Sequence, residues 1–499
     1  MKRWGVLLLA CMSVAHGADR FDAARARIHA KIENDGVPSV AVAVAKDGRV
    51  LWEEGFGWAD REQRVAADPH TVYLLASISK TFTGVGLMNL VQQGKITLDA
   101  PINDYLGSAR LHSWFADADA VTVRQMANHT SGLAPTEQFF YGEREATLVR
   151  PTDLTIARYG NVIRTPGARF EYNNFGYGVL GQVIAQVSGQ PFADYMRRQV
   201  FQPLNLTRTV VSSNGAPLPN TAILYGPQDE RIPRLAFDEP AFVGIQSSAH
   251  DLVRFGMFLL GQRVPGQRTL LDAATLSEMR RMTSHGEGIE DDYGVGLYTM
   301  DTYEGGPVGV GHGGSMSGSH TNLFLLPEEG LVIAVLTNRF ASAPADVRNE
   351  ILRALYPKWR GKTLPPTPEA SKPPSQPPAQ WQGEWAGTLS TYEGDKRVAL
   401  RVQPDGDVHL RIENQPWALV DRASFRDGSL QGLTSAFVPT SDAARRRHTT
   451  SLRLHSEGDR LVGVAIANSG PFDGADPYFV FALNYRVELR RAAAVEGLK

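Results

Sequence analysis

The chain has 499 residues, which is too long for one ordinary domain and long enough to bury a large core. Its composition, 42% hydrophobic and 21% charged, is typical of a globular protein. The formal net charge is −2, and the densest basic cluster is the short run at 445–447. This balance disfavours nucleic acid or another polyanion as a partner.

The N-terminal segment has the pattern of a secretory signal. Lys2 and Arg3 precede an apolar stretch, and small residues follow up to Gly17, so we expect residues 1–17 to be removed and the protein to be secreted or periplasmic. Cys11, the only cysteine, also fits a lipoprotein signal, but the apolar run continues past it and favours soluble export. Cleavage at Gly17 leaves no cysteine for disulfides, thiol catalysis or thiolate metal sites. No later apolar run is long enough for a stable membrane span.

The region 20–360 mixes strands and helices. Two apolar runs within 39–60, separated by the Asp47-Gly48 turn, predict a β-hairpin. Apolar stretches at 81–94 and 175–189 predict helices, because each ends on a glycine where a C-cap is expected. The run GLVIAVLTN at 330–338 predicts a strand buried on both faces. With strands at both ends and helices between, the pattern indicates an α+β domain whose sheet is completed by the two ends.

A proline-rich linker separates a second domain from the first. Residues 364–380 contain seven prolines, so we expect 361–380 to be an extended spacer. Residues 381–492 then alternate apolar and polar side chains around Gly-containing turns, which predicts a small antiparallel sheet or barrel. We expect a chain cut at the linker to keep a folded first domain.

Ser77 and Lys80 are the first candidates for chemistry, in the stretch LLASISKTFTG. Residues three apart share one face of a helix, so the ammonium group can reach the hydroxyl. A serine attacks a carbonyl only when a base takes its proton, and a lysine is such a base only when its pKa is lowered. The alternative is that Ser77 caps the helix and Lys80 is solvated. Taken alone, the two residues favour this alternative.

Tyr172 and Asn174 lie in PGARFEYNNFGYGVLG, in a turn-rich segment directly before an apolar helix. A buried tyrosine beside a lysine can relay protons, and its phenolate is a base when nearby cations lower its pKa. Asn174 offers an amide to a substrate carbonyl and to Lys80. The alternatives are a packing role for Tyr172 and the equally spaced pair Tyr159 and Asn161. We favour Tyr172 because the turn before it and the helix after it form a rigid mount.

His312, Gly314 and Ser315 form the third group, in VGVGHGGSMSGSH. We expect this stretch to be an edge strand, with glycines where a substrate backbone can approach closely and with the Ser315 N–H unpaired. The alternative is a loop histidine beside a glycine hinge, which a lone His-x-Gly would favour.

Together the three groups resemble the serine penicillin-recognising hydrolases, specifically the class C β-lactamase-related family. That family has Ser-x-x-Lys, Tyr-x-Asn and then Lys- or His-x-Gly, and this chain has all three in order, with the resemblance extending over residues 36–356. It implies a β-lactamase/transpeptidase-like domain, with an antiparallel sheet flanked by helices and an all-helical subdomain. The second domain resembles the lipocalin-like β-barrel of some peptidase members.

The resemblance implies the reaction machinery. Ser77 would be the acylated nucleophile, and Lys80 and Tyr172 would be the proton-transfer pair, with the choice of acylating base left open. The backbone N–H groups of Ser77 and Ser315 would form the oxyanion hole.

It also implies the residues that hold the substrate. Asn174 would position the substrate, and His312 and Gly314 would line its pocket. His129 and Ser131 match a stretch that the family keeps for structure, so we leave them out of the site. No cofactor or metal is implied.

The sequence departs from the β-lactamases proper at His312, where they carry lysine in Lys-Thr-Gly. A neutral histidine is a weaker anchor for the carboxylate of an antibiotic than a fixed positive charge. A histidine at this position resembles the DD-peptidase and D-aminopeptidase members of the family. We therefore expect an exported serine hydrolase that acts through an acyl-enzyme, preferably a peptidase for D-amino-acid-containing or small peptides.

A carboxylesterase or a weak β-lactamase of the same family is the alternative. A further alternative is a non-catalytic protein that binds peptides or cell-wall fragments. No Gly-x-Ser-x-Gly motif supports an α/β-hydrolase. The expected partner is a small-molecule or peptide substrate, and the second domain is a candidate for self-association. Substrate, stereospecificity and oligomeric state stay open at this level.

Overall fold

The computed structural model describes residues 19–113, 120–212, 219–284, 292–302, 307–359, 376–426, 428–471 and 478–492. The predicted signal segment 1–17 lies outside the described residues, as does most of the predicted linker 361–380. Within the described part, no helix combines the length and the apolar character needed to cross a bilayer.

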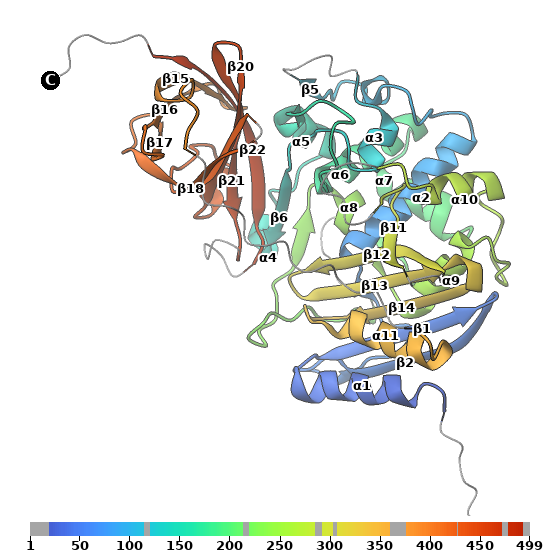
Figure 1. Ribbon diagram of the computed structural model, residues 1–499. Coiled ribbons are helices and arrows are strands. Elements are labelled where there is room, and N and C mark those ends of the chain that lie inside the picture. Colours follow the sequence, from blue (N-terminus) through green and yellow to red (C-terminus); the bar gives the residue numbers. More distant parts are fainter. Residues whose placement is uncertain are drawn as a thin grey trace, which may run out of the picture.

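A seven-stranded sheet with the order β11-β12-β13-β14-β1-β2-β3 forms the base of the first domain (Figure 1). Its strands are β1 (Ser39–Lys46), β2 (Arg49–Asp60), β3 (Val65–Ala66), β11 (Tyr298–Thr302), β12 (Val308–Met316), β13 (Ser319–Leu326) and β14 (Leu331–Thr337). The predicted hairpin is β1–β2, and the strand predicted to be buried on both faces is β14. Because β1 also pairs with β14, strands from the two ends of the domain complete the sheet, as predicted.

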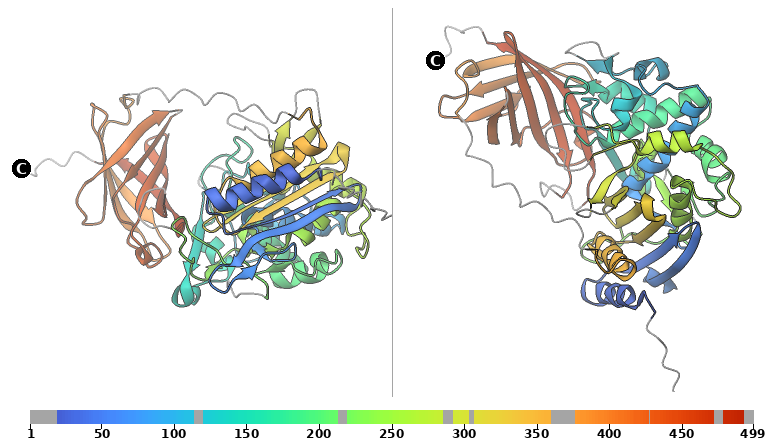
Figure 2. Two further views of the ribbon diagram at one scale, coloured as in Figure 1. Left: turned by 90° about the horizontal axis from the view of Figure 1, so that it is seen from below. Right: turned by 45° about the vertical axis from the view of Figure 1, so that its right-hand side comes forward.

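Alternation of valine and alanine along β1 gives the sheet two different faces. The valines join the apolar cluster under α1 (Asp22–Asn34) and α11 (Ala343–Leu355), whereas the alanines face the core, where α9 (Ala249–Leu259) packs. α9 comes close to the sheet at Gly256, where a Cβ would lie 2.4 Å from Val332 Cγ1 of β14. Figure 2 shows the sheet between the α1–α11 layer and the other helices.

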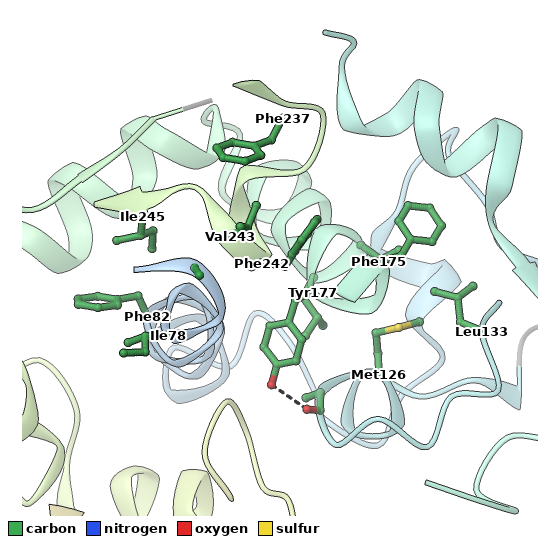
Figure 3. Packing of buried hydrophobic residues seen from close by; sticks show 14 of the residues in the cluster. Ile78, Phe82, Met126, Leu133, Phe175, Tyr177, Phe237, Phe242, Val243 and Ile245 are labelled. Atoms are coloured by element: carbon green, nitrogen blue, oxygen red, sulfur yellow. Dashed lines mark hydrogen bonds between the residues drawn. The ribbon is translucent and has the colours of Figure 1, made fainter. Parts of the chain in front are cut away.

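Two apolar helices form the centre of the core, α2 (Ser79–Gln92) and α6 (Asn174–Ser188) (Figure 3). Both end as predicted, with glycines in the left-handed region at Gly94 (φ 69°) and Gly189 (φ 66°). The other α-helices are α3 (Val123–Ala127), α4 (Gly142–Ala146), α5 (Thr152–Tyr159), α7 (Phe192–Met196), α8 (Pro240–Val243) and α10 (Ala273–Arg280). Short helices of other types are η1 (Ala76–Ile78), η2 (Ile102–Tyr105), η4 (Arg197–Phe201), η5 (Pro327–Glu329) and η6 (Ala443–Arg445).

Short strands complete the helical side of the domain. They are β4 (Tyr73–Leu74), β8 (Val210–Val211) and β10 (Ile245–Ser247) in one small sheet, β5 (His112–Ser113) and β7 (Asn161–Val162) in another, and the pair β6 (Glu137–Tyr141) and β9 (Leu235–Phe237). β4 leads directly into η1, so this small sheet fixes the chain just before Ser77.

The second domain is a closed antiparallel barrel, as the alternating pattern predicted. Its strands are β15 (Gly383–Ser390), β16 (Lys396–Val402), β17 (Val408–Ile412), β18 (Ala418–Arg426), β19 (Ser429–Thr434), β20 (Thr449–Glu457), β21 (Arg460–Ser469) and β22 (Phe481–Arg491). Each pairs with the next along the chain, and β22 pairs back with β15 to close the barrel.

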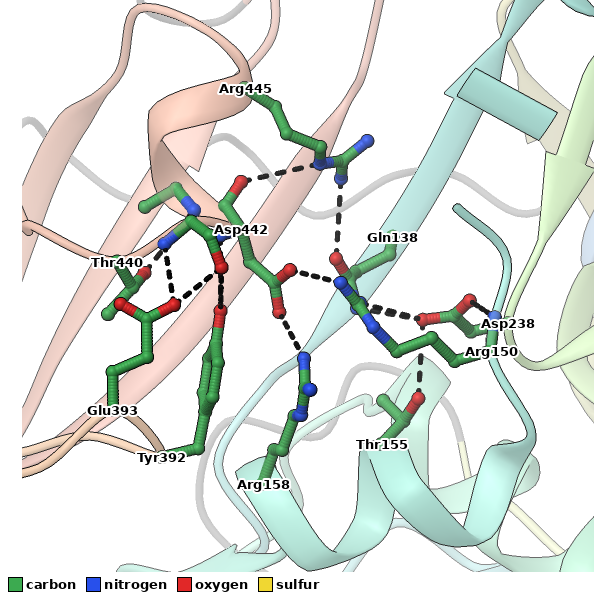
Figure 4. A network of polar contacts seen from close by, with 12 residues as sticks. Gln138, Arg150, Thr155, Arg158, Asp238, Tyr392, Glu393, Thr440, Asp442 and Arg445 are labelled. Atoms are coloured by element: carbon green, nitrogen blue, oxygen red, sulfur yellow. Dashed lines mark hydrogen bonds and ion pairs between the residues drawn. The ribbon is translucent and has the colours of Figure 1, made fainter. Parts of the chain in front are cut away.

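The barrel is joined to the first domain through hydrogen bonds and buried charge. β22 pairs with β6, so the barrel sheet continues into β6 and β9 of the first domain. Asp442, which is 1% exposed, accepts hydrogen bonds from Arg150, Arg158 and the Tyr159 hydroxyl across the interface (Figure 4). Cutting at the linker would expose this interface, and whether the first domain then stays folded remains a prediction to be tested.

Candidate active site

Ser77 lies in η1, immediately before α2. Lys80 Nζ is 3.0 Å from Ser77 Oγ, which brings the two predicted residues into hydrogen-bonding contact. Neither η1 nor α2 has a side-chain cap, so the alternative of Ser77 as a helix cap is wrong. Ala76, just before the serine, has φ 49°, a left-handed conformation that is strained for a residue other than glycine. The turn holds Ser77 partly exposed while Lys80 is fully buried.

The environment of Lys80 makes it a base near neutral pH. Burial lowers the pKa of Lys80 to about 7, and the Glu137 carboxyl opposes this shift only in part. The ammonium nitrogen is 3.3 Å from the Phe242 carbonyl oxygen and 5.0 Å from the centroid of the Tyr172 ring. A lysine that is about half neutral at pH 7 can take a proton from the serine hydroxyl.

Tyr172 is brought to Ser77 by the N-terminal end of α6. Asn173 caps this helix by accepting a hydrogen bond from Gly176 N (3.1 Å), and its amide donates to the Leu133 carbonyl (2.6 Å). Tyr172 and Ser77 line the same pocket, and the Ser77 side chain opposes only in part the rise in the pKa of Tyr172. Although 41% of the residue is exposed along the pocket, burial around the hydroxyl raises the pKa of Tyr172. This raised pKa of Tyr172 disfavours a phenolate, and the lowered pKa of Lys80 favours Lys80 as the base.

Asn174 lies beside the same two residues but has a different partner from the one expected. Its Nδ2 donates to Glu137 Oε1 at 2.8 Å, not to Lys80. Its Oδ1 is buried and has no hydrogen-bond partner. The Asn174 amide therefore orients the Glu137 carboxyl at the pocket wall.

The competing pair at Tyr159 and Asn161 is far from this chemistry. The Tyr159 hydroxyl donates to Asp442 at 2.7 Å, and the Asn161 amide donates to Asn484 at 2.8 Å. Both partners belong to the barrel, so this pair is part of the domain interface.

His312 lies on β12, which is the second strand of the sheet and not its edge, as β11 lies outside it. The expectation of an edge strand is wrong for the strand as a whole. However, β11 begins opposite Gly311, so residues 312–316 have no strand on that side among the described residues. Because β12 is longer than β11, this unpaired part of β12 faces the pocket that contains Ser77.

The His312 ring is buried and neutral. Its Nδ1 is 2.6 Å from the Gly313 carbonyl oxygen, which can only accept, so we assign the proton to Nδ1. Its Nε2 then accepts from the Tyr293 hydroxyl at 2.8 Å. Burial lowers the pKa of His312 to about 3, and the Lys80 ammonium adds to this shift. His312 lines the pocket without offering a positive charge to it.

Gly314 and Ser315 follow on the unpaired part of β12. A Cβ on Gly314 would lie 2.0 Å from the Leu75 carbonyl oxygen, so this glycine is required for packing against the segment that carries Ser77. The expected reason, approach of a substrate backbone, is not the one the geometry gives. The Gly313 N–H points outward to the Tyr298 hydroxyl (3.2 Å), and by the two-residue period of a strand the Ser315 N–H points the same way.

Two adjoining pockets share Ser77, Asn174 and Ser315. The first, of about 680 Å³, is also lined by Tyr172, Tyr293, Tyr298, His312 and Gly314. The second, of about 510 Å³, has walls of Glu137, Phe139, Phe242, Phe340 and the barrel residue Phe479. The nucleophile therefore lies where two cavities meet, with room for substrate on either side of a scissile bond.

The sequence did not identify Glu137, Tyr293 or Phe479 as pocket residues. An acidic residue beside the apolar run QFFY was a weak signal for Glu137, but nothing in the barrel sequence indicated Phe479. His129, left out of the site, accepts from Asn173 N at 3.1 Å, and its ring contacts that of Tyr172 at a tilt of 42°, with ring centroids 4.4 Å apart. This contact helps to hold the segment that carries Tyr172.

One group among the described residues could hold a metal ion. Glu53, His70 and His250 have ligand atoms within 4.8 Å of one another. None of the three lines either pocket at Ser77.

The chain is similar to known proteins over most of its length. A family model described as Beta-lactamase matches residues 24–358. Penicillin-binding protein 4 of Amycolatopsis lactamdurans is 29% identical over 408 residues, which cover 76% of this chain and 98% of that protein. Protein flp of Staphylococcus aureus is 25% identical over 312 residues, or 62% of this chain, and the chain spans about 60% of that protein's length.

Solved structures show the same fold. The octameric penicillin-binding protein homologue from Pyrococcus abyssi matches with a TM-score of 0.56 and 20% identity, over 94% of this chain and 99% of that one. A D-stereospecific amidohydrolase from Streptomyces sp. matches with a TM-score of 0.53 and 25% identity, over 68% of this chain and 99% of that one.

Proposed function

Because the chain belongs to the Beta-lactamase family, we propose that it is an exported serine hydrolase that cleaves an amide or ester bond through an acyl-enzyme. The favoured substrates are small peptides, including those with D-amino acids. The observation that carries the proposal is the 3.0 Å contact between Lys80 Nζ and Ser77 Oγ at an open pocket, with the pKa of Lys80 lowered to about 7. A protein that only binds peptides needs no such base beside an accessible serine.

In acylation, neutral Lys80 takes the proton from Ser77 Oγ as this oxygen bonds to the carbonyl carbon. The N–H groups of Ser77 and Ser315 stabilise the negative oxygen of the tetrahedral intermediate. When the carbon–nitrogen or carbon–oxygen bond breaks, the leaving group takes a proton from the Tyr172 hydroxyl, which Lys80 reprotonates. Tyr172 thus acts in its neutral form, in keeping with its raised pKa.

In deacylation, water attacks the acyl carbon and gives a proton to Lys80. The second tetrahedral intermediate collapses, Ser77 Oγ recovers its proton, and the acid product leaves. Lys80 therefore acts as the base toward Ser77 in acylation and toward water in deacylation.

An esterase is the second candidate function, favoured by the aromatic walls of the second pocket, Phe139, Phe242, Phe340 and Phe479. Efficient β-lactam hydrolysis is disfavoured by charge. His312 is neutral, and the only arginine or lysine among the described lining residues, Arg339, donates to Gly36, Asp229 and Pro227. Among the described pocket residues, no unpaired arginine or lysine is left to hold the carboxylate of an antibiotic.

The relatives support hydrolysis of peptide-like substrates. One relative is named a penicillin-binding protein, and a structural neighbour is described as a D-stereospecific amidohydrolase.

Self-association of this chain through the barrel is a further part of the proposal, and analytical ultracentrifugation tests it. Mass spectrometry of the exported protein tests cleavage after Gly17.

A fluorophosphonate probe tests the nucleophile. We expect wild-type protein to be labelled on Ser77, Ser77→Ala to be unlabelled, and the matched control Ser317→Ala, which changes another serine of the same pocket, to keep the label. Labelling that survives Ser77→Ala would refute the assignment. A panel of p-nitrophenyl esters, D- and L-aminoacyl anilides and a chromogenic cephalosporin then ranks the substrate classes.

A further inference from the structure

A cluster of two histidines and a glutamate on the first domain takes no part in the chemistry proposed for Ser77. Glu53 is on β2, His70 is in the turn before β4, and His250 is in the first turn of α9. One ligand atom from each side chain lies within 4.8 Å of the other two. The three residues line neither pocket at Ser77, so the proposed reaction does not explain why they lie together.

Main-chain contacts hold the three residues at one point, although they are far apart in the sequence. The His250 N–H donates to the Pro69 carbonyl oxygen at 3.1 Å, which attaches the turn that carries His70 to the start of α9. On the other side, a Cβ on Gly55 would lie 2.4 Å from Asp68 Cα, so this glycine lets β2 pass directly against the same turn. Asp68 Oδ1 accepts from the His70 N–H at 2.9 Å and fixes the shape of the turn. The backbone therefore preorganises the cluster, as a metal site requires.

The side chains of the cluster have few other partners. Glu53 Oε2 is 2.8 Å from His250 Nδ1, and His250 is the only ion-pair partner of Glu53 among the described residues. The neighbouring Glu54, in contrast, pairs with Arg25. The His70 ring is exposed and has no hydrogen-bond partner within the described part of the chain, and its centroid is 4.6 Å from that of His250. A histidine–glutamate ion pair thus accounts for His250 and Glu53 but gives His70 no role.

We propose that Glu53, His70 and His250 bind one zinc ion, with water as the fourth ligand. Two imidazole nitrogens and a carboxylate oxygen suit Zn²⁺, whereas Ca²⁺ and Mg²⁺ prefer oxygen ligands alone. Donor atoms around a tetrahedral zinc ion are about 3.3 Å apart, because each lies about 2.0 Å from the metal. On binding, the Glu53–His250 pair opens slightly and the exposed His70 side chain turns toward the ion.

The ion joins the segment before the nucleophile to two neighbouring elements. The chain runs from His70 through β4 into η1, which carries Ser77, and β4 pairs with β10, which leads into α9. Zinc bound at this cluster connects β2, the turn at His70 and the start of α9. Because the unfolded chain does not hold the three ligands together, binding stabilises the folded domain. The role of the ion is structural, since its ligands lie outside both pockets.

Zinc titration of the full chain tests the site. The protein is produced without a histidine tag, treated with EDTA and dialysed, so that it starts free of metal. Isothermal titration calorimetry should show one zinc ion per chain. Free zinc at about 100 times its Kd should raise Tm by about 4 °C, because only the folded state binds it. Magnesium or calcium at the same concentration should leave Tm unchanged.

Substitutions test the ligand set. His70→Asn carries little risk to folding, because the ring is exposed and has no hydrogen-bond partner among the described residues. It should weaken zinc binding at least about tenfold and abolish the rise in Tm. Glu53→Gln keeps an oxygen for His250 but removes the charge, and it should have the same effect. The matched control His112→Asn changes an exposed histidine on β5 of the same domain and should keep the wild-type affinity.

Two results would overturn the proposed site. One is the absence of saturable one-to-one zinc binding in the wild type. The other is one-to-one binding with unchanged affinity in His70→Asn, which would place the zinc at another group of residues. Fluorophosphonate labelling of Ser77 below Tm should be equal with zinc and with EDTA, and labelling that requires zinc would overturn the structural role. Failure of the zinc site leaves the hydrolase proposal intact, because labelling of Ser77 tests that proposal separately.

Discussion

The buried position of Lys80 predicts a pH profile that can be worked out from the structure. A lysine with its usual pKa of 10.5 is neutral in only about one molecule in 3,000 at pH 7, whereas one with a pKa of about 7 is neutral in about half. Burial therefore raises the fraction of working base at pH 7 by about three orders of magnitude. Because neutral Lys80 is the active form, kcat/KM should rise with pH, pass its midpoint near pH 7 and level off above it.

The assay measures kcat/KM for propionyl p-nitroanilide between pH 5.5 and 9, because this substrate has no group that titrates in that range. Below the midpoint the rate should fall tenfold for each pH unit. Lys80→Met fills a similar volume without a base, and we expect its kcat/KM to be lower by about 10²–10⁴-fold and to lack the acid limb. Glu137→Gln removes the carboxyl that raises the pKa of Lys80, so its acid limb should move to lower pH.

Two results would refute this reasoning. A flat profile from pH 5.5 to 9 in the wild type would show that no base with a pKa near 7 controls acylation. An acid limb that persists unchanged in Lys80→Met would assign the titration to another group.

Three further predictions concern packing around the site. Asp442→Ala should lower the free energy of unfolding by about 3–5 kcal/mol, measured by urea denaturation, because it leaves the partly buried Arg150 and Arg158 of the interface without their carboxylate; a change below 1 kcal/mol would contradict this. Gly314→Ala should reduce fluorophosphonate labelling at least tenfold, since its Cβ would meet the Leu75 carbonyl oxygen at 2.0 Å, whereas Gly313→Ala, with 3.4 Å to the nearest atom, should label normally. Phe479→Ala should raise KM for esters with bulky apolar groups by about tenfold relative to acetate esters, because part of the apolar pocket wall is lost; equal effects on both would argue against contact with substrate.

The local patterns of the sequence were sufficient for much of the fold. The β1–β2 hairpin, the glycine-terminated helices α2 and α6, the doubly buried β14 and the alternating strands of the barrel are all present. These elements could be predicted because hydrophobic period and turn residues act over a few neighbouring positions. The order of the three motifs then indicated the family.

The contacts between distant segments were less predictable. β11 covers part of the strand expected at the sheet edge, and β6 pairs with β22 of the barrel. A proline-rich linker indicates a domain boundary but not how closely the two domains pack. The pairing depends on which strand edges meet in space, and no local pattern records this.

For the site, the sequence by itself determined which side chains were available: a serine, a lysine three residues later, a tyrosine, an asparagine and a histidine in the family's order. Only the tertiary structure decided their chemistry. It buried Lys80 so that its pKa falls to about 7, kept Tyr172 protonated, and placed Glu137 and Phe479 beside Ser77. The reason is physical: a pKa and a pocket wall depend on desolvation and on charges from every segment packed nearby, which exist only once the chain has folded.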